Sequence, residues 1–279
     1  MSRDKARPQT KKEESMLFKT PIAIIGMASL LPDAQTVSRY WQNIIDEVDC
    51  IKPVPPDRWK IEDLYDQNPQ APDKTYSRVG GFIPETDFDP MEFGLPPNIL
   101  EVTDVSQLLS LLVARQVLAD AGLGQEENRE RMGVTLGVGG GQKLYMPLTT
   151  RLQYPIWREV LKSVGHSDKD AQIICEKIKK AYIPWVENSF PGMLGNVIAG
   201  RIANRFNLGG LNCVLDAACG GGLAAVKMAV SELVERRADV MITGGVDTDN
   251  SPFMYLCFAK TPADGHRAFL HAMFLINLF

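Results

Sequence analysis

Apolar residues recur along the chain in two patterns, continuous runs typical of buried strands and helical spacings typical of amphipathic helices. The first run comprises Ile22 to Ile25 and then Met27 beyond a glycine, and it predicts a strand buried on both faces. Residues 38–48 follow with apolar side chains at helical spacing, namely Tyr40, Trp41, Ile44, Ile45 and Val48. The ordered part of the chain therefore opens with a strand and a helix.

Two longer segments come next. Residues 49–100 are rich in proline and aromatic residues, and we expect a long ordered excursion in which the aromatic side chains supply a packing surface. Residues 104–122 predict the clearest helix of the chain. Asp104 is a good N-cap, Gln107 stands three positions later as in a capping box, and Gly122 sits where a C-cap belongs.

Three short buried strands are predicted within residues 131–141, 211–219 and 238–246. A helix from Gly221 to Arg237 separates the last two. A strand, a helix and a strand in that order imply a right-handed parallel crossover. The predicted fold class is α/β with a mostly parallel, buried sheet.

Composition and charge exclude some classes of function. The 279 residues are 45% hydrophobic and 23% charged, as in an ordinary globular protein. The net charge of −4 argues against a nucleic-acid partner, which usually requires a basic face. Residues 1–19 are polar and charged and lack the apolar core of a secretory signal, so we expect a disordered leader on a cytoplasmic protein.

The cysteines are widely spaced and form no CxxC pair, which argues against a zinc ribbon and against a disulfide framework; they are Cys50, Cys175, Cys213, Cys219 and Cys257. Cys219 stands apart because it follows a β-branched run and precedes three glycines and a long helical pattern. A cysteine at that place could be a small core residue, a metal ligand, a redox thiol or a nucleophile.

The predicted layout around Cys219 favours thiolate chemistry. The preceding strand delivers the cysteine to the start of a helix, where unpaired N–H groups and the positive end of the helix dipole favour the thiolate over the thiol. The same N–H groups can stabilise an oxyanion, and Gly220 and Gly221 let a substrate approach the backbone. This is the cysteine counterpart of a strand-turn-helix nucleophile elbow. On the residue pattern alone, a buried core cysteine and a nucleophile remain equally open.

Residues 215–229, LDAACGGGLAAVKMA, resemble the active-site cysteine motif of β-ketoacyl synthases. The resemblance extends to PIAIIGMASLLPD, GVTLGVGGGQK, ENSFPGMLGNVIAGRIANRFNLGGLNCVLDAAC and MITGGVDTDNSPFMYLCFAKTPA. It covers residues 20–263 and points to the ketosynthase domain of polyunsaturated fatty acid synthases, within the type I polyketide synthase family. The matching segments belong to the N-terminal half of that domain.

The resemblance implies a thiolase-like fold and a decarboxylative Claisen condensation. Cys219 would accept an acyl chain from the phosphopantetheine of an acyl carrier protein and lose it to a carbanion formed from a malonyl unit. No cofactor would be bound directly. The acyl carrier protein and a second copy of the chain are the implied partners, because ketosynthases of this family dimerise through a sheet in this half.

The match breaks after Ala263. The two histidines on which such ketosynthases depend belong to the family's second half, whereas this chain has only His166, His266 and His271, none of them in a matching segment. Residues 264–279 form an aberrant apolar tail that is too short to span a bilayer. We therefore expect this chain to catalyse no condensation, and the rival hypothesis is a non-catalytic module that binds thiolase-fold partners or carrier proteins.

Smaller features complete the prediction. Gly222 stands where the family has a serine, so we expect a looser start to the helix. The glycines at 137–141 lack the last glycine of a dinucleotide loop, and no NAD site is expected. Asp216 is expected to tie the elbow, and Asp247 and Asp249 to hydrogen-bond their own loop rather than a metal.

Overall fold

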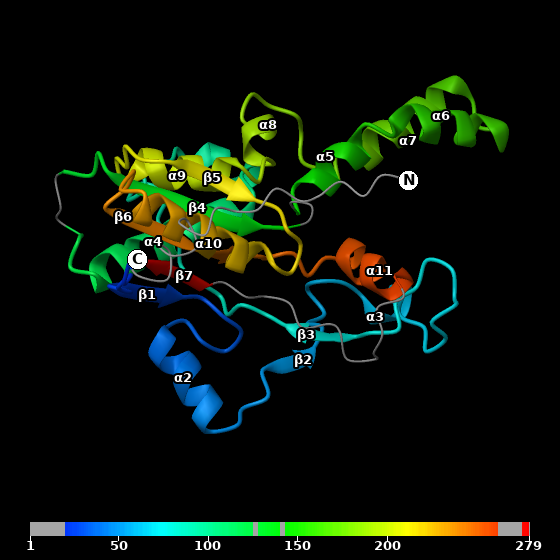
Figure 1. Ribbon diagram of the computed structural model, residues 1–279. Coiled ribbons are helices and arrows are strands. Elements are labelled where there is room, and N and C mark those ends of the chain that lie inside the picture. The colour runs from blue at the N-terminus through cyan, green and yellow to red at the C-terminus, as the bar shows by residue number, and fades with distance from the viewer. Residues whose placement is uncertain (1–19, 125–127, 140–142, 262–274, 279) are drawn as a thin grey trace, which may run out of the picture.

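A five-stranded sheet forms the centre of the protein (Figure 1). The computed structural model describes residues 20–124, 128–139, 143–261 and 275–278. Along the sheet the strands are ordered β1 (Gly26–Ser29), β7 (Leu275–Leu278), β6 (Val240–Val246), β4 (Met132–Val138) and β5 (Asn212–Leu215). β4 pairs in parallel with both β5 and β6, whereas β7 runs antiparallel to β6 and β1. The predicted α/β class with a mostly parallel sheet is confirmed.

Helices cover the two faces of the sheet unequally. α10 (Gly221–Val234) packs on one face, against β6 and β4, while α4 (Val105–Asp120) and α9 (Val197–Arg205) pack together on the other (Figure 1). The main core lies on the α4 side and takes its side chains from α4, α9 and alternate positions of β4, such as Val134, Leu136 and Val138. Of the intervening β4 positions, Thr135 and Gly137 contact α10 at Met228 and Gly221, and the small size of both residues lets α10 approach the sheet closely.

The crossover from β5 through α10 to β6 differs from the prediction in one respect. β5 and β6 are parallel, as expected, but they are not neighbours, because β4 lies between them. β5 is consequently the last strand of the sheet order, with a partner on one side only among the described strands. β5 and β6 therefore lie on either side of β4, which precedes both of them in the chain. The carboxyl ends of the three parallel strands lie at the same edge of the sheet.

The caps of α4 fall where the sequence puts them. The Asp104 carboxylate accepts a hydrogen bond of 3.0 Å from the N–H of Ser106, and Gly122 follows the helix with φ of 73°, which glycine adopts readily. Gln107 does not close a capping box. Its fully buried amide instead donates to three carbonyl oxygens at the end of α8 (Ser189–Gly192) and just after it, those of Pro191, Gly192 and Leu194.

The first predicted strand is wrong in position and burial. β1 begins only at Gly26, and the preceding Ile24 and Ile25 lie outside any strand, with 56% and 43% of their surface exposed. The predicted helix is confirmed as α2 (Val37–Ile45). The apolar side of α2 is nevertheless exposed, because the helix contacts the rest of the protein through Asn43.

The excursion between α2 and α4 is ordered. It contains β2 (Ile51–Pro53), α3 (Ile61–Leu64), β3 (Val79–Gly81) and the 3-10 helix η1 (Pro97–Val102). Its aromatic residues supply packing as predicted. Trp59 meets Tyr255 edge to face at 5.1 Å, and this contact joins the excursion to α11 (Pro252–Lys260).

Between β4 and α9 the chain forms α5 (Tyr145–Arg151), α6 (Tyr154–Ser163) and α7 (Asp168–Lys179). α6 and α7 pack against each other and project away from the sheet (Figure 1). Among the residues of these two helices only Ala171 and Cys175 are buried.

The tail supplies backbone to the sheet. Residues 275–278 form β7 between β1 and β6, whereas residues 262–274, like the predicted leader at 1–19, lie outside the described part. The boundaries expected at 19 and 263 stay predictions. No helix in the described ranges is both long and apolar enough to cross a membrane.

Candidate active site at the start of helix α10

Cys219 lies in the turn between β5 and α10, at the carboxyl edge of the sheet. The turn comprises residues 216–220, which we call the elbow, and all of them are exposed. The Cys219 side chain is therefore accessible to solvent rather than packed in the core. The alternative of a small core residue is wrong for this cysteine, and the position suits a thiol that meets a substrate.

The elbow is held in an unusual backbone conformation. Ala218, directly before the cysteine, has φ of 47°, in the left-handed region that costs a non-glycine residue about 1–2 kcal/mol. The Asp216 Oδ1 accepts a hydrogen bond of 3.1 Å from the N–H of Ala218 and fixes this turn. The predicted role of Asp216 as the tie of the elbow is thus confirmed.

The chain after Ala218 enters the helix at once. The N–H of Gly220 donates to the carbonyl of Ala217 at 3.0 Å, and the N–H of Gly221 donates to the carbonyl of Ala218 at 2.9 Å. Cys219 consequently sits immediately before the first turn of a 14-residue helix. The positive end of the helix dipole faces this position and favours a negative charge on sulfur or on a nearby oxygen.

A close approach between β4 and α10 fixes where the elbow stands. A Cβ atom added at Gly137 of β4 would lie 2.1 Å from the carbonyl carbon of Gly221 and 2.3 Å from the nitrogen of Gly222. Contacts between carbon atoms are favourable only from about 3.5 Å, so only glycine fits at position 137. The backbone of β4 therefore limits sterically how closely the first turn of α10 can approach the sheet.

The third glycine of the motif is under less constraint. A Cβ at Gly222 would meet the Cα of Gly245 on β6 at 3.6 Å, which is an ordinary van der Waals distance. A serine at position 222, as in the β-ketoacyl synthase motif that this segment resembles, would therefore have room for its Cβ. The expected looseness of the helix start is offset at Gly221, which is buried against Gly137.

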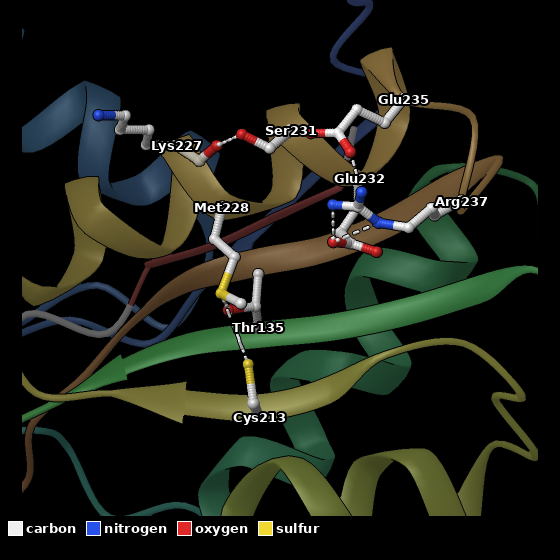
Figure 2. Close-up of polar contacts among 8 residues, drawn as sticks. All are labelled: Thr135, Cys213, Lys227, Met228, Ser231, Glu232, Glu235 and Arg237. Atoms are coloured by element: carbon white, nitrogen blue, oxygen red, sulfur yellow. Dashed lines mark hydrogen bonds and ion pairs between the residues drawn. The ribbon is translucent and has the colours of Figure 1, made fainter. Parts of the chain in front are cut away.

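Cys213 shows how differently a structural cysteine is placed (Figure 2). Its sulfur lies beneath α10, 3.5 Å from Thr135 Oγ1 and 3.7 Å from Met228 Sδ. Of the other cysteines, Cys175 is buried and Cys50 is half-buried, while Cys257 on α11 is exposed. Cys219 and Cys257 are thus the two exposed thiols of the chain.

The far end of α10 is anchored by an ion pair (Figure 2). Arg237 donates from Nε and Nη2 to Glu232 Oε1 at 3.0 and 2.6 Å, and Glu232 is buried. Its hydrogen bond to Glu232 raises the pKa of the Arg237 guanidinium above its ordinary value. The helix that carries the elbow is therefore fixed at both ends.

A small polar cavity lies near the same edge of the sheet. It is lined by Asp104, Ser106, Gly139, Lys143, Val246, Asp247, Thr248 and Asp249. The loop after β6 hydrogen-bonds to itself as predicted, with the N–H of Asp249 donating to Asp247 and the N–H of Ser251 to Asp249. Burial raises the pKa of Asp249, and the charges of Asp247 and Asp104 add to this effect.

The histidines do not join the elbow in the described residues. His166 lies exposed between α6 and α7, and His266 and His271 fall outside the described ranges. Within those ranges no group of three or more histidine, cysteine, aspartate or glutamate side chains could hold a metal ion. The chemistry visible at the elbow is that of a single thiol beside a helix N-terminus.

Two features of the site escape sequence reasoning. The positive φ of Ala218 has no signal in the sequence, because alanine does not favour that conformation. Gly137 looks in the sequence like one member of a glycine run, whereas its function is the contact with Gly221. A glycine within a predicted buried strand is the available signal, since it often marks a close approach of backbone.

The chain matches the family described as "Beta-ketoacyl synthase, N-terminal domain" over residues 19–268 and belongs to it. One component of the polyunsaturated fatty acid synthase of Thraustochytrium sp. is 44% identical over 244 residues, which are 87% of this chain and 9% of that protein. Polyketide synthase PksL of Bacillus subtilis is 28% identical over 92% of this chain and 5% of that protein. The chain thus spans a small part of these relatives' length.

Solved structures with the same fold are ketosynthases. The ketosynthase from module 6 of the bacillaene synthase of Bacillus subtilis superimposes with a TM-score of 0.68 at 22% identity, over 92% of this chain and 39% of that one. The oxazolomycin ketosynthase domain OzmH KS7 of Streptomyces albus gives a TM-score of 0.67 at 23% identity, over 91% and 41%. The fold is thiolase-like, as predicted.

Proposed function

Because the chain belongs to the β-ketoacyl synthase family, we propose that it carries the acyl-accepting cysteine of a ketosynthase that acts in polyunsaturated fatty acid or polyketide synthesis. The observation that supports this most directly is the exposed Cys219 at the start of α10, on a turn fixed by Asp216. The acyl chain arrives as a thioester on the phosphopantetheine of an acyl carrier protein in the cytoplasm. No cofactor takes part beyond that arm.

The first step is a transthioesterification. The Cys219 sulfur attacks the thioester carbonyl carbon, the bond from that carbon to the phosphopantetheine sulfur breaks, and the thiol proton of Cys219 passes to the departing sulfur. The charge that develops on the carbonyl oxygen lies near the positive end of the α10 dipole. The left-handed backbone of Ala218 forms part of the turn that presents the Cys219 thiol outside the core.

The second step is the condensation. A malonyl thioester loses carbon dioxide, and the resulting carbanion attacks the acyl carbonyl on Cys219, which releases the cysteine and forms a β-ketoacyl thioester. Histidines support this step in the enzymes that the chain resembles, and the described residues bring none to the elbow. We therefore expect the 279-residue chain to accept an acyl group and to catalyse no condensation.

The experiment is mass spectrometry of the purified chain after incubation with an acyl-pantetheine thioester. We expect one acyl group on Cys219 and none on the Cys219→Ser variant. Cys257→Ser is the matched control, because Cys257 is the other exposed thiol, and it should acylate like the parent. Equal labelling of Cys257 and Cys219, or an acyl group that persists in Cys219→Ser, would contradict the proposed acylation of Cys219. Turnover of a malonyl thioester would contradict the expectation that the chain catalyses no condensation.

A homodimer is the oligomeric state that we propose with this function. β5 pairs with β4 on one side and has no strand on its other side among the described residues. An exposed strand edge offers unpaired N–H and carbonyl groups to a second chain. Sedimentation analysis would test this, and a monomer at micromolar concentration would contradict it. A stable dimer without acylation would instead favour the rival hypothesis of a non-catalytic module.

A further inference from the structure

Helix α6 is held in place through one of its sides. The Trp157 ring stacks on the Tyr182 ring with their centroids 6.1 Å apart, and the Lys179 ammonium lies 4.8 Å from the centre of the Tyr154 ring. Arg151 donates to the carbonyl of Tyr182 at 2.9 Å, which closes the base of the pair. We call residues 151–182 the hairpin; it projects away from the sheet (Figure 1).

An apolar stripe runs along a different side of α6. Its members recur every four residues and are between 52% and 70% exposed; they are Leu152, Ile156, Val160 and Val164. Residues four apart lie on the same side of a helix, and the same periodicity places Arg158 and Lys162 on the opposite side of α6. A helix with an exposed apolar side and a basic polar side is typical of segments that lie in the surface of a lipid bilayer.

Charge distinguishes the hairpin from the other exposed apolar helix of the protein. The hairpin has seven lysine and arginine residues against four aspartate and glutamate residues, a net charge of +3 in a chain whose total is −4. Lys169, Lys177 and Lys180 are exposed. Residues 37–49, which include α2, have one basic residue and three acidic ones. An apolar surface with negative charge should therefore bind the hairpin and not α2.

We propose that the hairpin binds the surface of an anionic lipid bilayer, with the stripe among the lipid headgroups and the basic residues near the phosphates. A stable protein interface needs roughly 800 Å² on each partner, which is more than one row of four side chains can offer. A bilayer deforms around a single helix and needs no matching groove. The inference does not use Cys219, so it is independent of the proposed function.

The test floats the 279-residue chain with vesicles of equal parts phosphatidylcholine and phosphatidylglycerol, and with vesicles of phosphatidylcholine alone. We expect tight binding to the first kind only. Ile156→Gln with Val160→Gln should weaken it at least about tenfold, because two apolar side chains no longer enter the bilayer. Glutamine favours a helix at least as well as isoleucine or valine, so α6 should persist. Trp41→Gln with Ile45→Gln on α2 is the matched control; these residues are 60% and 59% exposed, and binding should stay unchanged.

Two further measurements do not depend on the folding of the α6 variant. Salt at about 1 M should weaken binding of the parent at least about tenfold, because it screens the charges of the hairpin. Amide exchange at residues 154–164 should slow when anionic vesicles are added, while exchange at residues 37–45 should not change.

Several results would overturn the proposal. They are equal binding to both kinds of vesicle, equal weakening by the α6 and α2 variants, and unchanged exchange at residues 154–164. Binding of an acidic carrier protein through Ile156 and Val160, without binding of vesicles, would assign the hairpin to a protein partner instead. Cys219→Ser should bind vesicles like the parent, so a failure of acylation and a failure of lipid binding can be told apart.

Discussion

The contact between Gly137 and the first turn of α10 makes Gly137→Ala the most informative substitution in the protein. The added Cβ would lie 2.1 Å from the carbonyl carbon of Gly221, and both groups belong to backbone, so no side chain can move aside. The strand and the helix must separate by about 1.4 Å to restore an ordinary contact of about 3.5 Å. Overpacking of this kind costs about 1–3 kcal/mol, and a clash between two backbones lies at the upper end of that range.

Urea unfolding of parent and variant gives the free energy directly. A loss of about 3 kcal/mol is a large fraction of the roughly 5–15 kcal/mol by which proteins of this kind are stable. The elbow moves with α10, so acylation of Cys219 should slow as well. Gly222→Ala is the control, since its Cβ has a clearance of 3.6 Å, and we expect no loss of stability. If the free energy of unfolding of Gly137→Ala were within about 0.5 kcal/mol of that of the parent, the steric constraint between β4 and α10 would be refuted.

The elbow, the buried amide of Gln107 and the loop after β6 each give a further prediction. Ala218→Val should destabilise the protein in thermal or urea unfolding, because a β-branched residue resists φ of 47° more than alanine does. Ala218→Gly should cost nothing, because relief of about 1–2 kcal/mol of strain offsets the freedom that glycine adds to the unfolded chain, and equal effects of the two substitutions would contradict strain at the elbow. Gln107→Leu should cost about 1–3 kcal/mol because buried carbonyls lose their donor, and a neutral result would show that these carbonyls find other partners. Burial raises the pKa of Asp249 above 3.8, so its folded form favours the proton and stability falls as pH rises from that value through the raised pKa. Asp249→Asn should therefore stabilise the protein at neutral pH and leave it unchanged in acid below that value, and an equal effect at both pH values would be inconsistent with burial of the charge.

Local signals predicted the elements whose stability is local. The α4 helix begins at the Asp104 cap and ends before Gly122 as its sequence indicates, because both features act within one turn. β4 and β6 were predictable because each is a continuous run of apolar and small residues, most of them buried. The position of Cys219 between β5 and α10 followed from the same patterns.

The errors arose where distant parts of the chain decide the outcome. Ile24 and Ile25 have the pattern of a buried strand, but their burial depends on a surface that the described residues do not supply. The amide of Gln107 could have closed a local capping box, yet carbonyls 84 to 87 residues away in sequence compete for it more successfully. The insertion of β4 between β5 and β6 is a property of the whole sheet, and periodicity alone carries no information about strand order.

The projecting pair α6 and α7 has a practical consequence for anyone who handles this protein. A helical pair that buries only Ala171 and Cys175 opens at low free energy, so a protease should cut first near the turn at 164–167. The two pieces would stay together, because Val134–Gly137 of β4, before the cut, pairs with Asn212–Leu215 of β5, after the cut. A preparation that runs as two bands on a denaturing gel can therefore still sediment as one particle with its thiol at the elbow in place.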